Sequence, residues 1–174
     1  IVADTNLVAC VLIPGARTEV AAKVHQADPD WVAPPLWRSE LCNILAMYCR
    51  AGLMTLPKAL EIFREAEEFM AHQDIPAGSI ETLILAHGSP CSAYDCEFVA
   101  AAQMPGVPLV TSNRQLLKHF PSTAISPAEF VALQTGGWAA VSLASWRPPP
   151  DSRRLIQTSS ATKTSNMPVA TIIN

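Results

Sequence analysis

The sequence predicts an α/β fold with a mostly parallel sheet. Short apolar segments of strand character alternate with longer segments in which apolar residues recur at helical spacing, a pattern typical of parallel α/β layers. The chain has 174 residues, of which 49% are hydrophobic and only 16% are charged. Such a chain can bury a sizeable core, so we expect one globular domain followed by an appendage.

The N-terminal part of the chain supplies two of the expected strands. Residues 1–3 are apolar and form a buried strand that ends at Asp4. Residues 16–28 repeat small and apolar side chains at helical spacing, which predicts a helix. A second short strand is expected at residues 31–33, because the two prolines that follow stop it.

Two longer helices follow these strands. One starts near Leu36 and ends at Gly52, since glycine suits the position just past a helix end. The other covers residues 56–72 and is the clearest amphipathic segment of the chain. Its predicted apolar stripe consists of Leu60, Phe63 and Phe69/Met70.

The alternation of elements continues in the second half of the chain. Residues 76–89 predict a helix that is capped by Ser79 and closed by Gly88. Residues 92–103 predict another helix, and residues 106–113 contain a compact strand.

The last two expected helices carry recognisable caps. One begins after Asn113, whose side chain is suited to cap it. A final strand and helix lie within residues 123–133, where Ser126 and Glu129 have the spacing of a capping box. Together these segments complete the predicted domain, residues 1–135.

The composition changes at the end of the chain. Residues 136–174 contain a triple proline and a Ser/Thr-rich run and show no sustained period. This composition is typical of an appendage outside the core, and we expect it to be flexible. Its basic residues and two tryptophans could also serve an interaction.

Charge and cysteine content narrow the class of protein. The chain has 12 basic and 15 acidic residues, so no basic excess indicates non-specific nucleic-acid binding. The five cysteines form no Cys-x-x-Cys pair, and none of the four histidines has zinc-ligand spacing to a cysteine. We therefore expect free thiols in a reducing cytoplasm. The sequence has neither a leader nor an apolar run of roughly 20 residues, which predicts no membrane association.

Asp4 is the first of several carboxylates in unusual positions. It ends a strand, and ligands bind at the carboxyl ends of strands in open α/β sheets. Burying an isolated carboxylate is costly unless a cation or hydrogen bonds meet it. The alternative is that Asp4 only caps the turn at Thr5 or Asn6.

Glu40 is the second such carboxylate. It lies one helical turn from both Trp37 and Ile44, at the rim of the inward face of its helix. A glutamate held there needs a partner or a metal ion. The alternative is an exposed first-turn acid that complements the helix dipole.

Two further candidates lie in the second half. Asp95 falls in the first turn of its helix, where it either faces Asp4 or completes a capping box with Ser92. Glu97 is expected to be solvated, because two positions along a helix turn it roughly 200° away from Asp95. Thr111 and Asn113 come at the end of a strand. They either line the pocket with the acids or are ordinary turn residues.

Taken together, three carboxylates and an amide are expected at one edge of the sheet. Like charges this close require a compensating cation, and hard oxygen ligands suit Mg²⁺ or Mn²⁺. Such an ion can activate water and stabilise the leaving oxygen in phosphodiester cleavage. The sequence offers no competing Ser-His-Asp or Cys-His set and no glycine-rich phosphate loop.

Four motifs give the sequence a family resemblance. In order, they read IVADTNLV, VAPPLWRSELCNIL, SAYDCEFVAAA and PLVTSN. At these separations the set resembles the PIN-domain ribonucleases, and in particular the VapC-type toxins of prokaryotic toxin–antitoxin pairs. The resemblance runs from Ile1 to about Leu133.

The resemblance implies a fold and a site. It implies a PIN-like, three-layer α/β/α sandwich that cleaves RNA with Mg²⁺ or Mn²⁺. Asp4, Glu40 and Asp95 match the three principal acids of the family. Asn6 and Thr111 match residues of the substrate pocket. The family pattern would place a fourth acid at position 113, where this sequence has Asn113.

The resemblance also implies partners and leaves alternatives. It implies an RNA substrate left with 5′-phosphate and 3′-hydroxyl ends, a homodimer and a cognate antitoxin. Arg38, Arg114 and Lys118 could steer the RNA backbone, although ordinary solvated side chains are the simpler interpretation. The rival hypothesis is a catalytically impaired PIN-like module that binds RNA or protein, which Asn113 favours. A receiver-like domain lacks support, because adjacent acids after the first strand are absent.

Overall fold

The computed structural model describes residues 1–135 and is a mixed α/β protein, as predicted. This part of the chain contains eight helices and a sheet of three strands. The predicted appendage, residues 136–174, lies outside the described residues. The elements are β1 (Val2–Ala3), α1 (Thr5–Leu12), α2 (Thr18–Ala27), α3 (Trp37–Arg50), α4 (Leu56–Phe69), α5 (Ser79–His87), α6 (Ala93–Gln103), β2 (Leu109–Val110), α7 (Arg114–His119), β3 (Ala124–Ile125) and α8 (Pro127–Thr135).

The sheet is short and wholly parallel. Its strand order is β1-β2-β3, with Ala3 opposite Val110 and Val110 opposite Ile125. The strand expected at residues 31–33 is reduced to isolated bridges, in which Val32 pairs with Val2. Proline follows this segment directly and offers no backbone N–H, which accounts for the early end of pairing.

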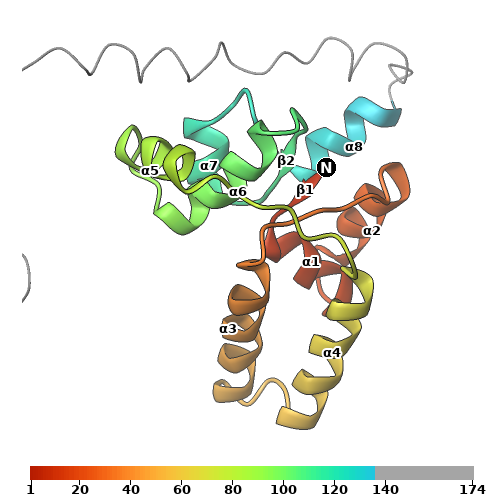
Figure 1. Cartoon of the computed structure of the whole chain (residues 1–174). Coiled ribbons are helices and arrows are strands. Elements are labelled where there is room, and N and C mark those ends of the chain that lie inside the picture. Colours follow the sequence, from red (N-terminus) through yellow and green to blue (C-terminus); the bar gives the residue numbers. More distant parts are fainter. Residues whose placement is uncertain (136–174) are drawn as a thin grey trace, which may run out of the picture.

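Helices lie on both sides of the sheet (Figure 1). The helices α5, α6 and α7 lie on one side of the strands, and α2 and α8 lie on the other. The helices α3 and α4 form an antiparallel pair that extends away from the sheet. Helix α6 packs directly against β1 and β2, which explains why its residues 98–102 are all buried.

The core consists of the strands and of large side chains that pack beside them. Both residues of β1 and of β2 are inaccessible to solvent. Trp31 and Trp37 are the bulkiest fully buried side chains beside them, followed by Leu41, Ile62 and Met70. Burying each large apolar side chain stabilises the fold by roughly 1.5–3 kcal/mol. None of the helices in residues 1–135 has the length and apolarity that a membrane crossing requires.

Helix α4 buries only part of the predicted stripe: Met70 is fully buried, and Phe69 is partly buried against the core. Leu60 is 47% exposed, so its assignment to the stripe was wrong, and Phe63 is only half-buried. The buried face instead passes through small residues, which let neighbouring helices approach closely. Its members are Ala59, Ile62 and Ala66, continued by Met70 just past the helix end.

The helix ends follow the predicted capping chemistry with one correction. The cap of α5 is Gly78, which is extended, whereas Ser79 is already the first helical residue. The predicted closing residue Gly88 is confirmed. The capping box of α8 is also confirmed, with the Ser126 hydroxyl 2.6 Å from the Glu129 carboxylate and the Glu129 N–H 3.3 Å from that hydroxyl.

Candidate active site

Parallel pairing of β1 with β2 brings the first two site residues together. Asp4 directly follows β1 and Thr111 directly follows β2, so both lie at the carboxyl edge of the sheet. The Thr111 hydroxyl donates a hydrogen bond to Asp4 Oδ2. Asp4 is 6% exposed and Thr111 is fully buried. The sequence prediction that these two residues meet is therefore matched by the structure.

Asp4 caps α1, which was the alternative considered for it, and its carboxylate lies at the carboxyl edge of the sheet. Its Oδ1 accepts a hydrogen bond from the Asn6 backbone N–H at 2.9 Å, which caps α1. The Asn6 side-chain amide also donates to Oδ1, at 3.4 Å. Because Asn6 and Thr111 bind the two oxygens separately, the carboxylate is held in one orientation at the edge of the sheet.

Glu40 joins the same edge from α3. The Thr5 hydroxyl donates to Glu40 Oε2 at 2.6 Å, and Thr5 is the first residue of α1, next to Asp4. The glutamate is half-buried in the first turn of α3. Sequence reasoning considered Thr5 only as a turn residue and missed this contact. A hydroxyl next to the first acid is the signal that could have indicated it.

Asp95 approaches from the first turn of α6. Ser92 caps this helix by accepting from the Asp95 N–H at 3.1 Å, and its hydroxyl donates to Asp95 Oδ2 at 2.8 Å. Ser92 therefore caps the helix as expected, but the Asp95 carboxylate meets the Ser92 hydroxyl and not the Ser92 backbone N–H that would complete a capping box. The other oxygen, Oδ1, accepts from the Asn113 side-chain amide at 3.0 Å, so Asp95 is also linked to the end of β2.

Asn113 occupies the position of the absent fourth acid. Its Oδ1 accepts from the backbone N–H groups of Gln115, at 2.9 Å, and Leu116, at 3.5 Å, and so caps α7. Its own backbone N–H donates to the Thr111 hydroxyl at 2.9 Å. Asn113 therefore caps α7 as expected and also lies beside Asp95, one of the acids.

The acids share one electrostatic environment. Burial raises the pKa of Asp4 above its ordinary value, the hydrogen bonds from Thr111 and Asn6 offset part of this, and the charge of Asp95 raises it further. Burial also raises the pKa of Glu40, and the charges of Asp4 and Asp95 add to that rise. Within residues 1–135, no lysine or arginine forms an ion pair with any of these three carboxylates.

Glu97 differs from its prediction. It was expected to be solvated, but it is half-buried, and its charge contributes to the raised pKa of Glu40. The helical angle that separates Glu97 from Asp95 still holds. It does not separate Glu97 from Glu40, because Glu40 lies on a different element. A fourth carboxylate thus contributes to the field of the site.

The carboxylates do not form a preassembled metal cage. In the part of the chain that is described, no three His, Cys, Asp or Glu side chains meet as a group that could hold a metal ion. Each of the three carboxylates separately offers the hard oxygen donors that Mg²⁺ prefers, and among residues 1–135 none of them has a basic partner. Glu40 Oε1 accepts no hydrogen bond from residues 1–135 and is available as a ligand.

Arg38 is committed to a structural contact. Its guanidinium contacts the two Asp74 oxygens at 2.8 and 2.9 Å, and its Nε lies 3.7 Å from Glu67. It also lies over the Trp37 ring, 4.7 Å from the centroid. The simpler interpretation of Arg38, that of an ordinary structural side chain, therefore fits the geometry.

Arg114 and Lys118 are exposed on α7, which begins directly after Asn113. These two cations lie on the helix that Asn113 caps.

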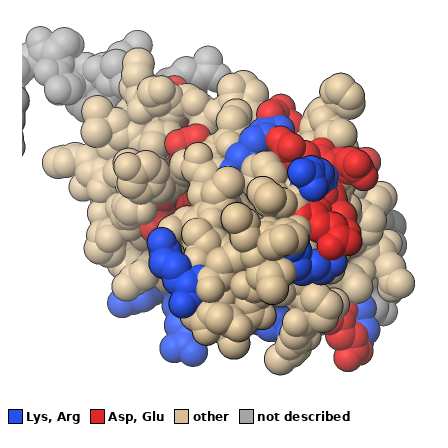
Figure 2. Space-filling view, turned by 90° about the horizontal axis from the view of Figure 1, so that it is seen from below, with Lys and Arg blue, Asp and Glu red and all other residues tan. Residues whose placement is uncertain are grey.

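The face of the molecule seen from below carries basic and acidic side chains next to one another and has no continuous basic surface (Figure 2). This face therefore does not indicate non-specific electrostatic binding of RNA.

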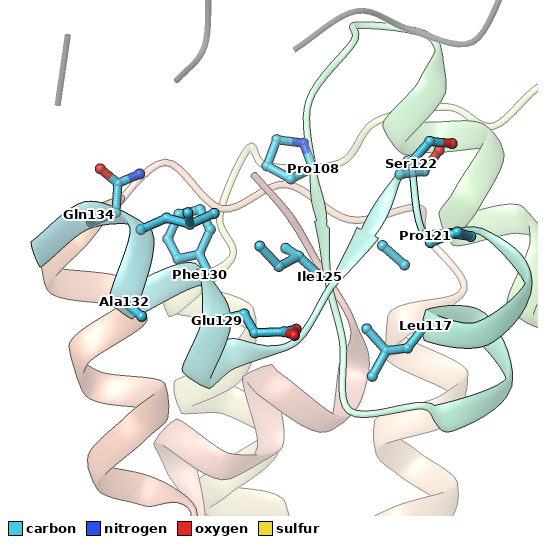
Figure 3. Close-up of a pocket in the computed structure, with 12 residues that line it drawn as sticks. Pro108, Leu117, Pro121, Ser122, Ile125, Glu129, Phe130, Ala132 and Gln134 are labelled. Carbon is cyan, nitrogen blue, oxygen red and sulfur yellow. The ribbon is translucent and has the colours of Figure 1, made fainter. Parts of the chain in front are cut away.

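A separate apolar groove lies between α7, β3 and α8 (Figure 3). Its volume is about 810 Å³, and its wall includes Leu117, Ile125 and Phe130. The acids of the site do not line it. Glu129 lies at this groove but is engaged by Ser126 in the cap of α8. The groove is therefore distinct from the acidic site.

Comparison with known proteins adds one finding. No protein-family model matches the chain. The chain is similar to Ribonuclease VapC3 from Pyrobaculum aerophilum, with 27% identity over 128 residues, which is 70% of this chain and 95% of that protein. At this distance, the similarity confirms the resemblance to VapC-type PIN-domain ribonucleases that the four sequence motifs predicted.

Proposed function

We propose that this protein is a metal-dependent endoribonuclease that hydrolyses RNA phosphodiester bonds, and that it is the toxin of a toxin–antitoxin pair. The observation that carries the proposal is the position of Asp4, Glu40 and Asp95, which come from separate elements, share one electrostatic environment and have no basic partner among residues 1–135. The similarity to a protein named as a ribonuclease supports the proposal.

Asp4, Glu40 and Asp95 would hold Mg²⁺ or Mn²⁺. When bound, such an ion supplies an activated water and stabilises the charge on the leaving oxygen. Its two positive charges would also offset the repulsion among the three carboxylates. Glu40 Oε1 is the oxygen most readily offered, since Oε2 already accepts from Thr5.

The hydroxyls around the acids have an orienting role. Thr111, Thr5 and Ser92 each donate to one of the three carboxylates. Such contacts fix the direction in which a ligand oxygen presents its remaining lone pair, as outer partners do in metal sites. The substrate phosphate would approach the same edge, where Asn6 also lies.

Further features belong to this proposal. The α/β core would be a PIN-like three-layer sandwich within one domain, residues 1–135. The protein would act in the cytoplasm as a homodimer, and a cognate antitoxin would block the acidic site. The resemblance to VapC-type toxins implies the sandwich, the homodimer and the antitoxin, and the similarity to a protein named Ribonuclease VapC3 supports that resemblance.

Cleavage of a fluorogenic RNA during a Mg²⁺ titration tests the proposal. We expect the wild type to cleave and the variant Asp4→Asn to lose about 100-fold or more of its rate, because a ligand charge is removed. Glu65→Gln is a matched control, since Glu65 is an exposed acid on α4. Equal cleavage by wild type and Asp4→Asn would refute the nuclease proposal. RNA binding without cleavage by the wild type would instead support the impaired binding module.

A further inference from the structure

We propose that Asn113 is a positioning residue that ties Asp95 to Asp4, in place of a fourth charged metal ligand. This inference rests on the proposed nuclease function, because it concerns the same acids. Four hydrogen bonds of Asn113 carry it: two join it to the start of α7, one joins it to Asp95 and one joins it to Thr111.

The orientation of the Asn113 amide follows from its partners. Its Oδ1 meets two backbone N–H groups, those of Gln115 and Leu116, which can only donate. Its Nδ2 faces Asp95 Oδ1 at 3.0 Å, and a carboxylate can only accept. If the amide were flipped, its NH₂ group would face the two backbone N–H donors and its oxygen would face the Asp95 carboxylate, so neither contact could form. The carbonyl oxygen of Asn113 is therefore engaged by α7 and is turned away from a ligand role.

The backbone of Asn113 extends this link to Asp4. Its N–H donates to the Thr111 hydroxyl at 2.9 Å, so that oxygen already accepts one bond. The single hydroxyl hydrogen of Thr111 then goes to Asp4 Oδ2. A continuous chain of hydrogen bonds therefore runs from Asp95 through Asn113 and Thr111 to Asp4. It fixes Asp4, at the end of β1, relative to Asp95, in the first turn of α6.

A charged residue could not make the same link. Aspartate at position 113 would still cap α7, because its oxygens accept from backbone N–H groups. It would, however, present an acceptor to Asp95 where Asn113 presents a donor, and would add a negative charge next to it. The amide thus holds Asp95 without increasing the repulsion among the acids.

A double-mutant cycle in the full chain tests this role, with Mn²⁺ affinity as the readout. The variants are Asn113→Ser, Asp95→Ala and their combination, and Asn113→Ser preserves a capping oxygen. We expect Asn113→Ser to weaken Mn²⁺ binding about tenfold in the wild-type background. In the Asp95→Ala background we expect less than about a twofold further loss, because the group that Asn113 holds is gone. The control Asn43→Ser, on an exposed face of α3, should leave the affinity unchanged.

Unchanged Mn²⁺ affinity in Asn113→Ser would overturn the proposal, as would equal losses in both backgrounds. The side-chain NMR signal of Asn113 gives a second readout that needs no metal. We expect its amide proton resonances to shift in Asp95→Ala, and the absence of a shift would also overturn the proposal. If the wild type neither binds Mn²⁺ nor cleaves RNA while this signal shifts, then the nuclease function fails and the hydrogen bond stands.

Discussion

The Thr111 hydroxyl donates a hydrogen bond to the Asp4 carboxylate, across 107 positions of the chain. The contact exists because β1 and β2 run parallel in a register that pairs Ala3 with Val110. The next residue of each strand then lies at the same edge. Thr111 also accepts from Asn113, so one small side chain connects the first acid with the residue that contacts Asp95.

Replacing Thr111 with valine should destabilise the protein. The change keeps the shape of the side chain but leaves Asp4 Oδ2 and the Asn113 N–H without their hydrogen-bond partner, at a cost of roughly 1–3 kcal/mol. Urea denaturation measures the loss. Thr111→Ser keeps the hydroxyl and should retain most of the stability, and a serine variant as unstable as the valine variant would contradict the role of the hydrogen bond.

The metal-free protein should lose stability as the pH rises through the raised pKa of Glu40. Burial and neighbouring charges raise this pKa in the folded state, so the folded protein binds the proton more tightly than the unfolded chain does. The contribution is complete below the unfolded value of about 4.3 and is lost above the folded value. Thermal unfolding in EDTA should therefore show a steeper decline between pH 4 and neutrality for wild type than for Glu40→Gln. Parallel curves would contradict this interpretation.

The ion pair between Arg38 and Asp74 should stabilise the protein only above acidic pH. The Arg38 hydrogen bond lowers the pKa of Asp74, so the contribution is present above the unfolded value and is lost as the pH falls through the folded one. Because the pair is partly exposed, Asp74→Asn should cost only about 0–1 kcal/mol at pH 7. Urea denaturation at pH 7 and pH 3 measures the difference, which should be smaller at pH 3 than at pH 7. An equal difference at both pH values would indicate a contact independent of charge.

Glu97 should influence the titration of Glu40. Removing the charge with Glu97→Gln should move the titration midpoint of the Glu40 carboxyl to lower pH, because one source of repulsion is lost. NMR of side-chain carboxyl carbons in EDTA follows this midpoint. Glu61→Gln, an exposed change on α4, should leave it in place, and an equal shift in both variants would exclude a local effect.

Local chemistry explains why much of the fold could be predicted. The caps at Ser92, Asn113 and Ser126 depend on residues a few positions away, and all three form. The strands at residues 2–3 and 109–110 follow from short apolar runs before polar residues. Helix α1 could not be predicted in this way. Its residues are largely apolar, and a short apolar run does not distinguish a helix from a strand.

Contacts between distant elements explain what could not be predicted. The hydrogen bond from Thr5 to Glu40 depends on how α1 meets α3, and helical spacing within either segment carries no information on that meeting. The same holds for the hydrogen bond between Asn113 and Asp95, although their position at one edge was expected, and for the influence of Glu97 on Glu40. The exposure of Leu60 has a similar origin, because the small residues Ala59 and Ala66 proved to be the better packing surface of α4.

The strands of this sheet are two residues long, which has a consequence for how the chain tolerates changes in length. Side chains alternate between the faces of a strand, so one added residue within β1 would turn Asp4 away from Thr111. The bend between α3 and α4, where Gly52 has a φ of 70°, does not orient any residue of the site, so a change in its length has no such effect. We expect variation in length to collect at that bend and to be excluded from the first four residues.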